Sequence, residues 1–307
     1  MANDEIARRH PQMGIRIIVI TIMTWWSLFK ETYQKWNADK APRLGAALAY
    51  YTTFSLVPLL VLSITIAGLA FGQVAAQAAI MAQIESLMGP QSASAIHQML
   101  NIAQKPSNGL LASLLAIGTL LFGASGVFAQ LQDALNTVWK VEPLGDRGLW
   151  GTIQERFLSL LAVLGTGFLL LVSLVLSAAL SAFGTLYLAW FPGQEAVLHV
   201  TDFSVSFIVI TVLFAMMFKL LPDATVAWRD VWTGAALTSL LFTLGKFLIG
   251  LYLGKADVGS AYGTAGSLVI MLVWVYYSSQ IVLFGAEFTS VYAERCGSRI
   301  VARAQAA

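Results

Sequence analysis

The sequence predicts an all-α membrane protein, a polytopic bundle of six transmembrane helices. Hydrophobic residues make up 58% of the 307 residues and charged residues only 11%, whereas a soluble domain carries about 25% charged residues. The apolar residues are also gathered in long runs, and residues 45–72 and 157–194 contain no Asp, Glu, Lys or Arg. Apolar runs of about 18 residues or more are typical of helices that cross a bilayer.

Residues 1–43 are predicted to form a cytoplasmic tail and an interfacial amphipathic helix. The apolar stretch at residues 17–29 is closely bracketed by Arg16 and Lys30, and it contains Trp25 and Trp26. Tryptophan favours the membrane–water interface, and the stretch is short for a span. We therefore expect a helix lying in the membrane plane within residues 15–36. An additional span is the alternative.

Residues 44–290 are predicted to form one transmembrane domain with six spans. The third apolar run is longer than a hydrocarbon core of about 30 Å requires, so its helix is expected to tilt, kink or protrude. No Pro/Ser/Gly-rich linker divides the chain. The predicted spans are residues 44–71, 109–131, 157–190, 197–220, 231–253 and 262–287.

Lysine and arginine are distributed unevenly between the predicted loops. Only Lys105 and Lys255 lie on one side of the predicted bundle, and Lys246 lies inside a span. Basic residues accumulate in cytoplasmic loops, so both termini are expected in the cytoplasm of a bacterial-type inner membrane. The other fifteen of the 18 basic residues lie on the opposite side: Arg8, Arg9, Arg16, Lys30, Lys35, Lys40, Arg43, Lys140, Arg147, Arg156, Lys219, Arg229, Arg295, Arg299 and Arg303.

The outer loop at about residues 73–108 is expected to contain two short amphipathic helices, separated at Gly89-Pro90. Apolar residues recur at helical spacing on both sides of this break. These helices form either a static cap or a mobile lid over a substrate path. Residues 291–307 are expected to be a cytoplasmic tail.

Sequence motifs of soluble enzymes are missing. The three histidines, His10, His97 and His199, are too scattered to form a metal-binding motif from sequence neighbours. The chain also lacks a phosphate-binding GxxxxGK[ST] loop, a GxSxG nucleophile motif and a basic face interleaved with aromatics. We expect no catalytic residue, no metal site, no cofactor and no nucleic-acid partner, and hence no enzyme.

Polar residues within or beside the spans are the candidates for function, because polar groups are costly in lipid. Several of them fall at similar depths toward the cytoplasmic side and are expected to line one partly polar cavity. The alternative for Asp133 and Glu287 is a salt bridge at the headgroup boundary, and for Lys246 it is a side chain that reaches the membrane surface. The candidates are Tyr50, Tyr51, Ser55, Asp133, Asn136, Lys246, Tyr262 and Glu287.

Short motifs follow one another between residues 40 and 294. They are ALAYY at 47–51 with FSLVP at 54–58, LQDALN at 131–136 with Trp139, Leu221-Pro222 with Trp228, Gly234-Ala235, Tyr252, Tyr262-Gly263, and residues 274–276 leading to Gly285-Ala286-Glu287. In order and spacing this set resembles the BrkB/YihY family of bacterial inner-membrane proteins, formerly labelled ribonuclease BN. The resemblance implies six helices and no settled catalytic residues.

Three functions follow as hypotheses. The first, in line with the resemblance, is a transporter or lipid-handling protein of envelope integrity, which binds membrane lipids or an anionic, lipid-like substrate. The second is a structural or assembly factor of the envelope that transports nothing, with its polar groups saturated internally. A tRNA-processing nuclease is the least favoured, because metal-assisted hydrolysis needs ligands that this chain does not supply.

Overall fold

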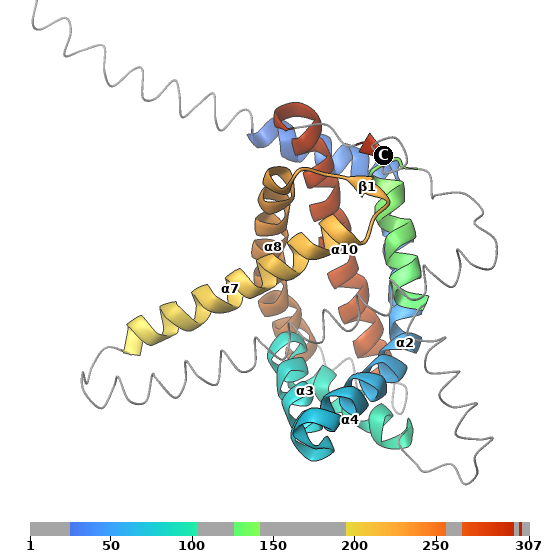
Figure 1. Cartoon of the computed structure of the whole chain (residues 1–307), viewed down its shortest axis with the longest axis vertical. Helices are drawn as coiled ribbons and strands as arrows, with labels where there is room; N and C mark the ends of the chain where they lie inside the picture. The colour runs from blue at the N-terminus through green and yellow to red at the C-terminus, as the bar shows by residue number, and fades with distance from the viewer. Residues whose placement is uncertain (1–24, 104–125, 142–194, 256–265, 298–300, 303–307) are drawn as a thin grey trace, which may run out of the picture.

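The computed structural model describes residues 25–103, 126–141, 195–255, 266–297 and 301–302, and this part of the chain is almost entirely helical. Two short strands, β1 (Ala224–Thr225) and β2 (Val301–Ala302), pair antiparallel. The helices are 25–38, α2 (Ala41–Phe71), α3 (Gln73–Met88), α4 (Pro90–Ala103), 126–138, α7 (Glu195–Leu220), α8 (Trp228–Lys255) and α10 (Gly266–Cys296) (Figure 1).

Four of these helices are long and apolar enough to cross a membrane. They contain the candidate spans Ala41–Leu69, Phe203–Leu220, Trp228–Tyr252 and Leu268–Cys296. These match the first, fourth, fifth and sixth predicted spans, so the prediction of a helical membrane bundle is confirmed. The third predicted span and most of the second lie outside the described residues, so the total of six stays a prediction.

Glycine and proline set the ends of the helices after the first span. Gly72, at φ 83°, separates α2 from α3, and Gly89, at φ 81°, separates α3 from α4. Glycine adopts such positive φ angles without steric cost. Pro90 then begins α4, where its missing N–H is not needed.

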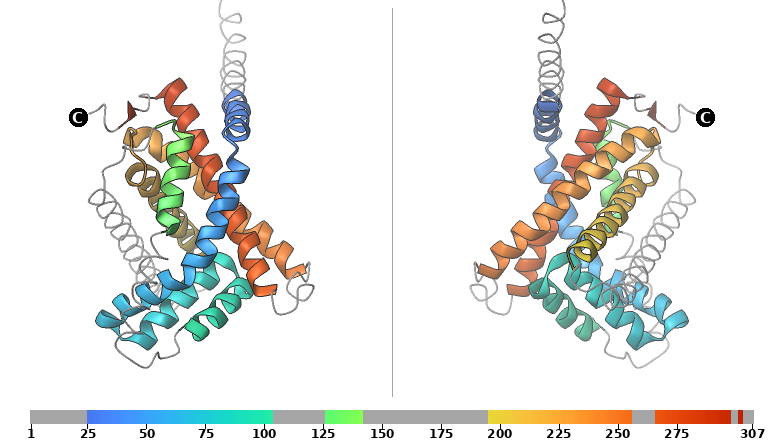
Figure 2. Two further views of the ribbon diagram at one scale, coloured as in Figure 1. Left: turned by 90° about the vertical axis from the view of Figure 1, so that its right-hand side faces the viewer. Right: turned by 90° about the vertical axis from the view of Figure 1, so that its left-hand side faces the viewer.

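The helices α2 and α10 cross near the middle of the molecule (Figure 2). The α10 helix contacts both α2 and α8, and α7 packs along α8. The helices α3 and α4 lie together at one end, where α4 contacts α10. Ile96 and Leu100 of α4 are fully buried there, which agrees with the apolar face expected from the sequence.

The opposite end, which we call the basic end, carries most of the described lysines and arginines. Here the C-terminal ends of α7 and α10 and the N-terminal end of α8 come together, and helix 25–38 lies across them (Figures 1 and 2). The charge asymmetry of the sequence is therefore a spatial asymmetry as well. Basic residues on these segments are Lys30, Lys35, Lys219, Arg229 and Arg295.

Glycine and threonine allow α8 and α10 to approach closely. A Cβ atom at Gly234 of α8 would overlap Thr289 of α10, and one at Gly285 of α10 would overlap Thr238 of α8. Each threonine hydroxyl donates to the backbone of its own helix, Thr238 to Gly234 O and Thr289 to Gly285 O, both at 2.7 Å. Small residues favour helix association in lipid because they let the backbones come close.

We expect Gly285→Ala to destabilise this contact, because the new Cβ would displace Thr238. Overpacking of this kind costs about 1–3 kcal/mol, so purified protein in detergent should unfold at a lower temperature. Gly250→Ala on α8 is the matched control, since nothing described lies within 4 Å of a Cβ there. The double variant Gly285→Ala/Thr238→Ala should recover much of the loss. A double variant as unstable as the single one would contradict this explanation.

Candidate functional site

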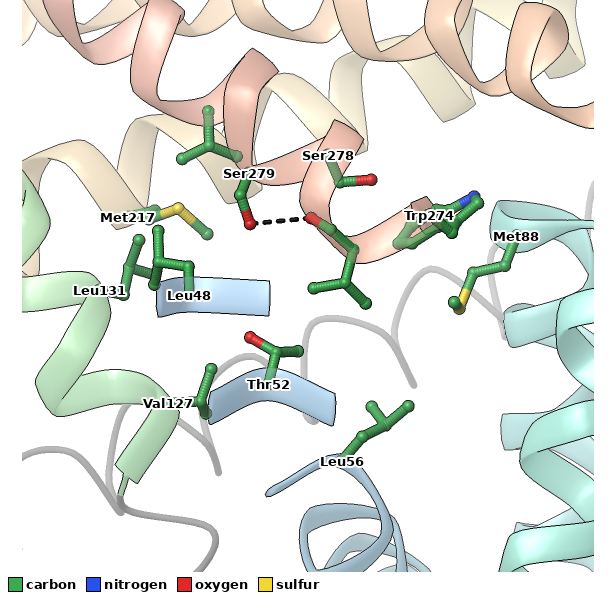
Figure 3. A pocket seen from close by; sticks show the side chains of 12 residues that line it. Leu48, Thr52, Leu56, Met88, Val127, Leu131, Met217, Trp274, Ser278 and Ser279 are labelled. Atoms are coloured by element: carbon green, nitrogen blue, oxygen red, sulfur yellow. Dashed lines mark hydrogen bonds between the residues drawn. The ribbon is translucent and has the colours of Figure 1, made fainter. Parts of the chain in front are cut away.

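An apolar pocket of about 200 Å³ lies where α2, helix 126–138, α7 and α10 meet (Figure 3). From α2 it is lined by Leu48, Thr52 and Leu56, which are spaced one turn apart and therefore share one face. Residues of helix 126–138, α7 and α10 complete the wall, and Met88 of α3 lies on the side toward the α3–α4 end. We call this space the apolar pocket.

Among the described residues that line the apolar pocket, three carry a hydroxyl group, and apart from the Trp274 indole none of the others has a polar side-chain group. The hydroxyls belong to Thr52, Ser278 and Ser279. The Ser279 hydroxyl donates to the carbonyl of Val275 at 2.8 Å, so this donor is already used within α10 (Figure 3). A wall of this kind suits a hydrocarbon chain, since an ion or a sugar would lose its water without gaining equivalent partners.

A polar clamp holds helix 126–138 against the segment between α7 and α8. The Asn136 amide accepts from the Asp223 backbone N–H at 2.9 Å and donates to the Asp223 carboxylate at 3.0 Å. Gln132 donates to the same carboxylate oxygen at 3.2 Å. Asn136 is only 3% exposed, and its amide is satisfied by this clamp. The geometry indicates a role in positioning the helix.

Glu287 lies on α10 near the basic end, and its side chain is 0% exposed. Within the described part of the chain, neither of its carboxylate oxygens has a hydrogen-bond partner. The neighbouring backbone is held firmly, because the Trp139 indole N–H donates to the carbonyl of Ala286 at 3.3 Å. Glu287 is thus a buried acid in a well-packed surrounding, and a second acidic side chain, Asp39, is its neighbour.

The tyrosines of the first span lie at the surface of the described structure. Tyr50 and Tyr51 are both exposed, and the Tyr50 ring lies 4.9 Å from that of Phe54. Ser55 is buried, and a Cβ at Gly126 would lie 3.6 Å from its hydroxyl and 3.7 Å from the Tyr51 ring. Tyr51 and Ser55 therefore face the start of helix 126–138.

The remaining candidates are scattered. Asp133 is exposed on helix 126–138, Lys246 is half-buried on α8 and already interacts within the protein, and Tyr262 lies outside the described residues. None of the described candidates contributes to the wall of the apolar pocket. The structure does not bring them together around one cavity, and their roles as binding residues stay predictions.

Sequence reasoning had noted Ser278 and Ser279 among the polar residues of the last span, but it missed Thr52 of the pocket wall and two acidic residues, Asp223 and Asp39. Asp223 follows Leu221-Pro222, where a break between two apolar runs already marked an interhelical turn. Asp39 precedes Lys40 and Arg43 at the start of the first span. A lone acid among basic residues beside a span is the signal that could have identified Asp39.

Metal binding finds no support in the part of the chain that the structure describes. Within it, no group of three or more His, Cys, Asp or Glu side chains is placed to hold a metal ion. The only cysteine, Cys296, is exposed at the end of α10.

Comparison with known proteins identifies relatives over most of the chain. The family described as Virulence factor BrkB matches residues 32–307. A UPF0761 membrane protein of Verminephrobacter eiseniae is 29% identical over 276 residues, covering 87% of this chain and 62% of the relative. One of Stenotrophomonas maltophilia is 31% identical over 261 residues, covering 82% and 57%. The chain thus spans about three-fifths of the length of these curated relatives. No solved structure matches it.

The clamp between Asn136 and Asp223 is open to a direct test. Asn136→Ala leaves the Asp223 backbone N–H without its partner and removes one of the two side-chain donors to the Asp223 carboxylate, which costs about 1–3 kcal/mol. We expect a lower unfolding temperature in detergent. Asp133→Asn, an exposed change one turn away on the same helix, is the control and should unfold like the wild type. Equal unfolding temperatures for Asn136→Ala and the wild type would exclude the clamp as a source of stability.

Proposed function

The chain belongs to the Virulence factor BrkB family of membrane proteins, and from this premise we propose that it binds and moves a lipid-type molecule across or within the membrane. It is then a transporter or lipid-handling protein that serves the integrity of the cell envelope, and it is not an enzyme. The substrate class is an anionic amphipathic molecule with at least one hydrocarbon chain.

The apolar pocket is the observation that carries this proposal. Dry apolar cavities of about 150 Å³ accept a molecule of the size of benzene, so a pocket of about 200 Å³ has room for a short length of hydrocarbon chain. In the part of the chain that the structure describes, its wall comes from five helices and contains no charged side chain. A site for a small ionic solute would be expected to offer charges or several free hydrogen-bond groups.

The basic end supports the choice of an anionic head group. Lysines and arginines beside a membrane attract anionic lipids, each contributing about 1 kcal/mol. Arg43, near the start of α2, and Lys140, at the end of helix 126–138, are both exposed. Both helices contribute to the pocket wall, so a lipid with its chain in the pocket has cations along its path to the basic end.

The proposed topology has six spans, with both termini in the cytoplasm of a bacterial inner membrane. The uneven distribution of the 18 basic residues supports this orientation. Helix 25–38 is consistent with the proposed interfacial helix, because it lies across the end of the bundle (Figure 1). In this orientation α3 and α4 are on the outer face.

A non-transporting assembly factor is the second candidate. The observation in its favour is the way helix 25–38 is fastened to α10 by two ion pairs, one between Lys35 and Glu294 at 2.6 Å and one between Glu31 and Arg295. A fixed cap of this kind suits a static scaffold. Exposed ion pairs contribute at most about 1 kcal/mol each, however, so they do not prevent movement.

Filling the apolar pocket tests the proposal. Thr52→Phe and Ser278→Phe each place a ring in the space that a hydrocarbon chain would occupy, and a loss of about 1.4 kcal/mol of binding free energy corresponds to tenfold weaker binding. We expect less lipid to co-purify with these variants in mild detergent, as measured by quantitative mass spectrometry. The variants should also fail to complement a deletion strain.

The matched control is Leu244→Phe on α8, where the side chain is 55% exposed and does not contribute to the pocket. It should retain the lipid and the complementation of the wild type. The lipid proposal is wrong if well-folded Thr52→Phe and Ser278→Phe keep both properties. Retained complementation with no lipid in any sample would favour the assembly factor.

The single native cysteine tests the orientation. Cys296 is exposed at the basic end, so a membrane-impermeant maleimide should label it only after the cells are permeabilised. In a Cys296→Ser background, Ser94→Cys on the exposed face of α4 should be labelled in intact cells once the outer membrane is opened. The reverse pattern would place the basic end outside.

A further inference from the structure

A pair of acidic side chains lies at the contact between α10 and the turn that precedes α2. Glu287 is completely buried, and both of its carboxylate oxygens lack a hydrogen-bond partner within the described residues. The Oδ2 atom of Asp39 is also buried and lacks a hydrogen-bond partner there. The Asp39 carboxyl lies within hydrogen-bonding reach of Glu287.

The fold holds Asp39 in this position through helix 25–38. Leu28 of that helix packs against Phe288 and Val291 of α10. The chain then turns sharply, with the Asp39 N–H donating to Lys35 O at 2.8 Å and Lys40 in the left-handed conformation at φ 54°. A non-glycine residue adopts this conformation at a steric cost. Packing and hydrogen bonding thus fix the conformation of this turn, and the turn directs Asp39 toward α10.

The cations near the pair come from two elements. Lys35 on helix 25–38 is already paired with Glu294 at 2.6 Å, and Lys140 at the end of helix 126–138 is exposed. On α8, the residues opposite this part of α10 are the uncharged Gly234 and Thr238. The acid of α8, Asp230, lies against Gly297, ten residues beyond Glu287. No cation is thus buried with the two acids in the described part of the chain.

Glu287 is fully buried and the Oδ2 atom of the half-buried Asp39 is shielded from water. Neighbouring carboxyl groups in such a place resist ionising together, because each charge disfavours the other and burial disfavours the charged form. From this geometry we infer that Asp39 and Glu287 bind one proton between them, with one carboxyl donating a hydrogen bond to the other. The pair then carries one negative charge in place of two. A shared proton also supplies one hydrogen bond, which joins two of the three buried oxygens that otherwise lack a partner.

A bound cation is the competing way to neutralise the pair. Cations such as Ca²⁺ take six or more oxygen ligands. In the described residues no third acidic or histidine side chain joins Asp39 and Glu287 to form a possible metal group. The structure therefore favours the proton.

The pair lies between the apolar pocket and the basic end. Val282 lines the pocket, and Glu287 is five residues further along α10, or about 7.5 Å at 1.5 Å per residue. If the turn at Asp39 moves away from α10, water reaches both carboxyls, the proton leaves to that water, and both groups ionise. Opening of the basic end is thereby coupled to release of one proton. This use as a coupling site rests on the proposed lipid transport, whereas the proton site itself does not.

Infrared spectroscopy tests the proton site directly. Full-length protein in vesicles of phosphatidylethanolamine and phosphatidylglycerol is compared between neutral and strongly alkaline buffer, in the C=O stretching region of protonated carboxylic acids. We expect a band at neutral pH that is lost on alkalinisation and shifts in heavy water. Glu287→Gln and Asp39→Asn should each abolish it, because the amide replaces the protonated partner and leaves the other group ionised.

The control is Asp133→Asn, which removes an exposed acid at the same end of the molecule and should leave the band unchanged. The inference is overturned if the wild type shows no carboxylic band. It is also overturned if the band survives in Glu287→Gln or in Asp39→Asn and that variant is folded. Thermal unfolding with sodium, potassium or choline chloride at constant ionic strength tests the cation. A higher unfolding temperature in sodium or potassium that Glu287→Gln abolishes would also overturn it.

These readouts do not depend on lipid. Loss of the band in both amide variants, together with normal lipid binding in the pocket-filling variants, would retain the proton site and reject the proposed transport. A wild-type protein without the carboxylic band, together with loss of lipid from the pocket-filling variants, would retain lipid binding and reject the proton site.

Discussion

The close contact of α10 with its neighbours is the constraint on which the rest of the described structure depends. Hydrocarbon surrounds such a bundle, so apolar side chains gain little by leaving the lipid, and helices associate through shape and hydrogen bonding. Gly234 and Gly285 give α8 and α10 matching surfaces for the threonines of the opposite helix. With α10 held in this way, α2, α4 and helix 25–38 all pack against the same helix.

Two parts of α10 differ in how tightly they are packed. Around Glu287 the helix is tightly packed, with the neighbouring Ala286 and Phe288 completely buried. Around Ser278 the packing is incomplete, and the apolar pocket lies there against α2. The pocket is therefore supported by a helix that is well packed on the side toward Glu287.

Two buried polar arrangements differ in how completely they are satisfied. The Asn136 amide both donates to and accepts from Asp223, so that clamp is locally complete and fixes one helix in place. Asp39 and Glu287 have oxygens without a partner in the described residues. A satisfied buried network rigidifies a structure, whereas an incomplete one is costly and needs a ligand, a proton or water. The difference separates the clamp, which positions a helix, from the pair of acids that we propose to bind a proton.

The sequence by itself determined the class of the protein, four spans that the structure describes, and the gathering of basic residues at one end. These properties depend on residue type and on distances of one helix length or less, so a linear pattern contains them. The break at Gly89-Pro90 was visible for the same reason.

Only the tertiary structure decided which polar residues meet. Asn136 and Asp223 are 87 residues apart, and Asp39 reaches Glu287 from the other end of the chain. The sequence also grouped Tyr50 and Asp133 with Glu287, because the depth of a residue in the membrane can be predicted from its position in a span. The direction in which a helix faces cannot be predicted in this way when nearly all of its residues are apolar. For that reason Leu48 in the pocket and Leu244 at the surface look alike in the sequence, and only the packing of neighbouring helices distinguishes them.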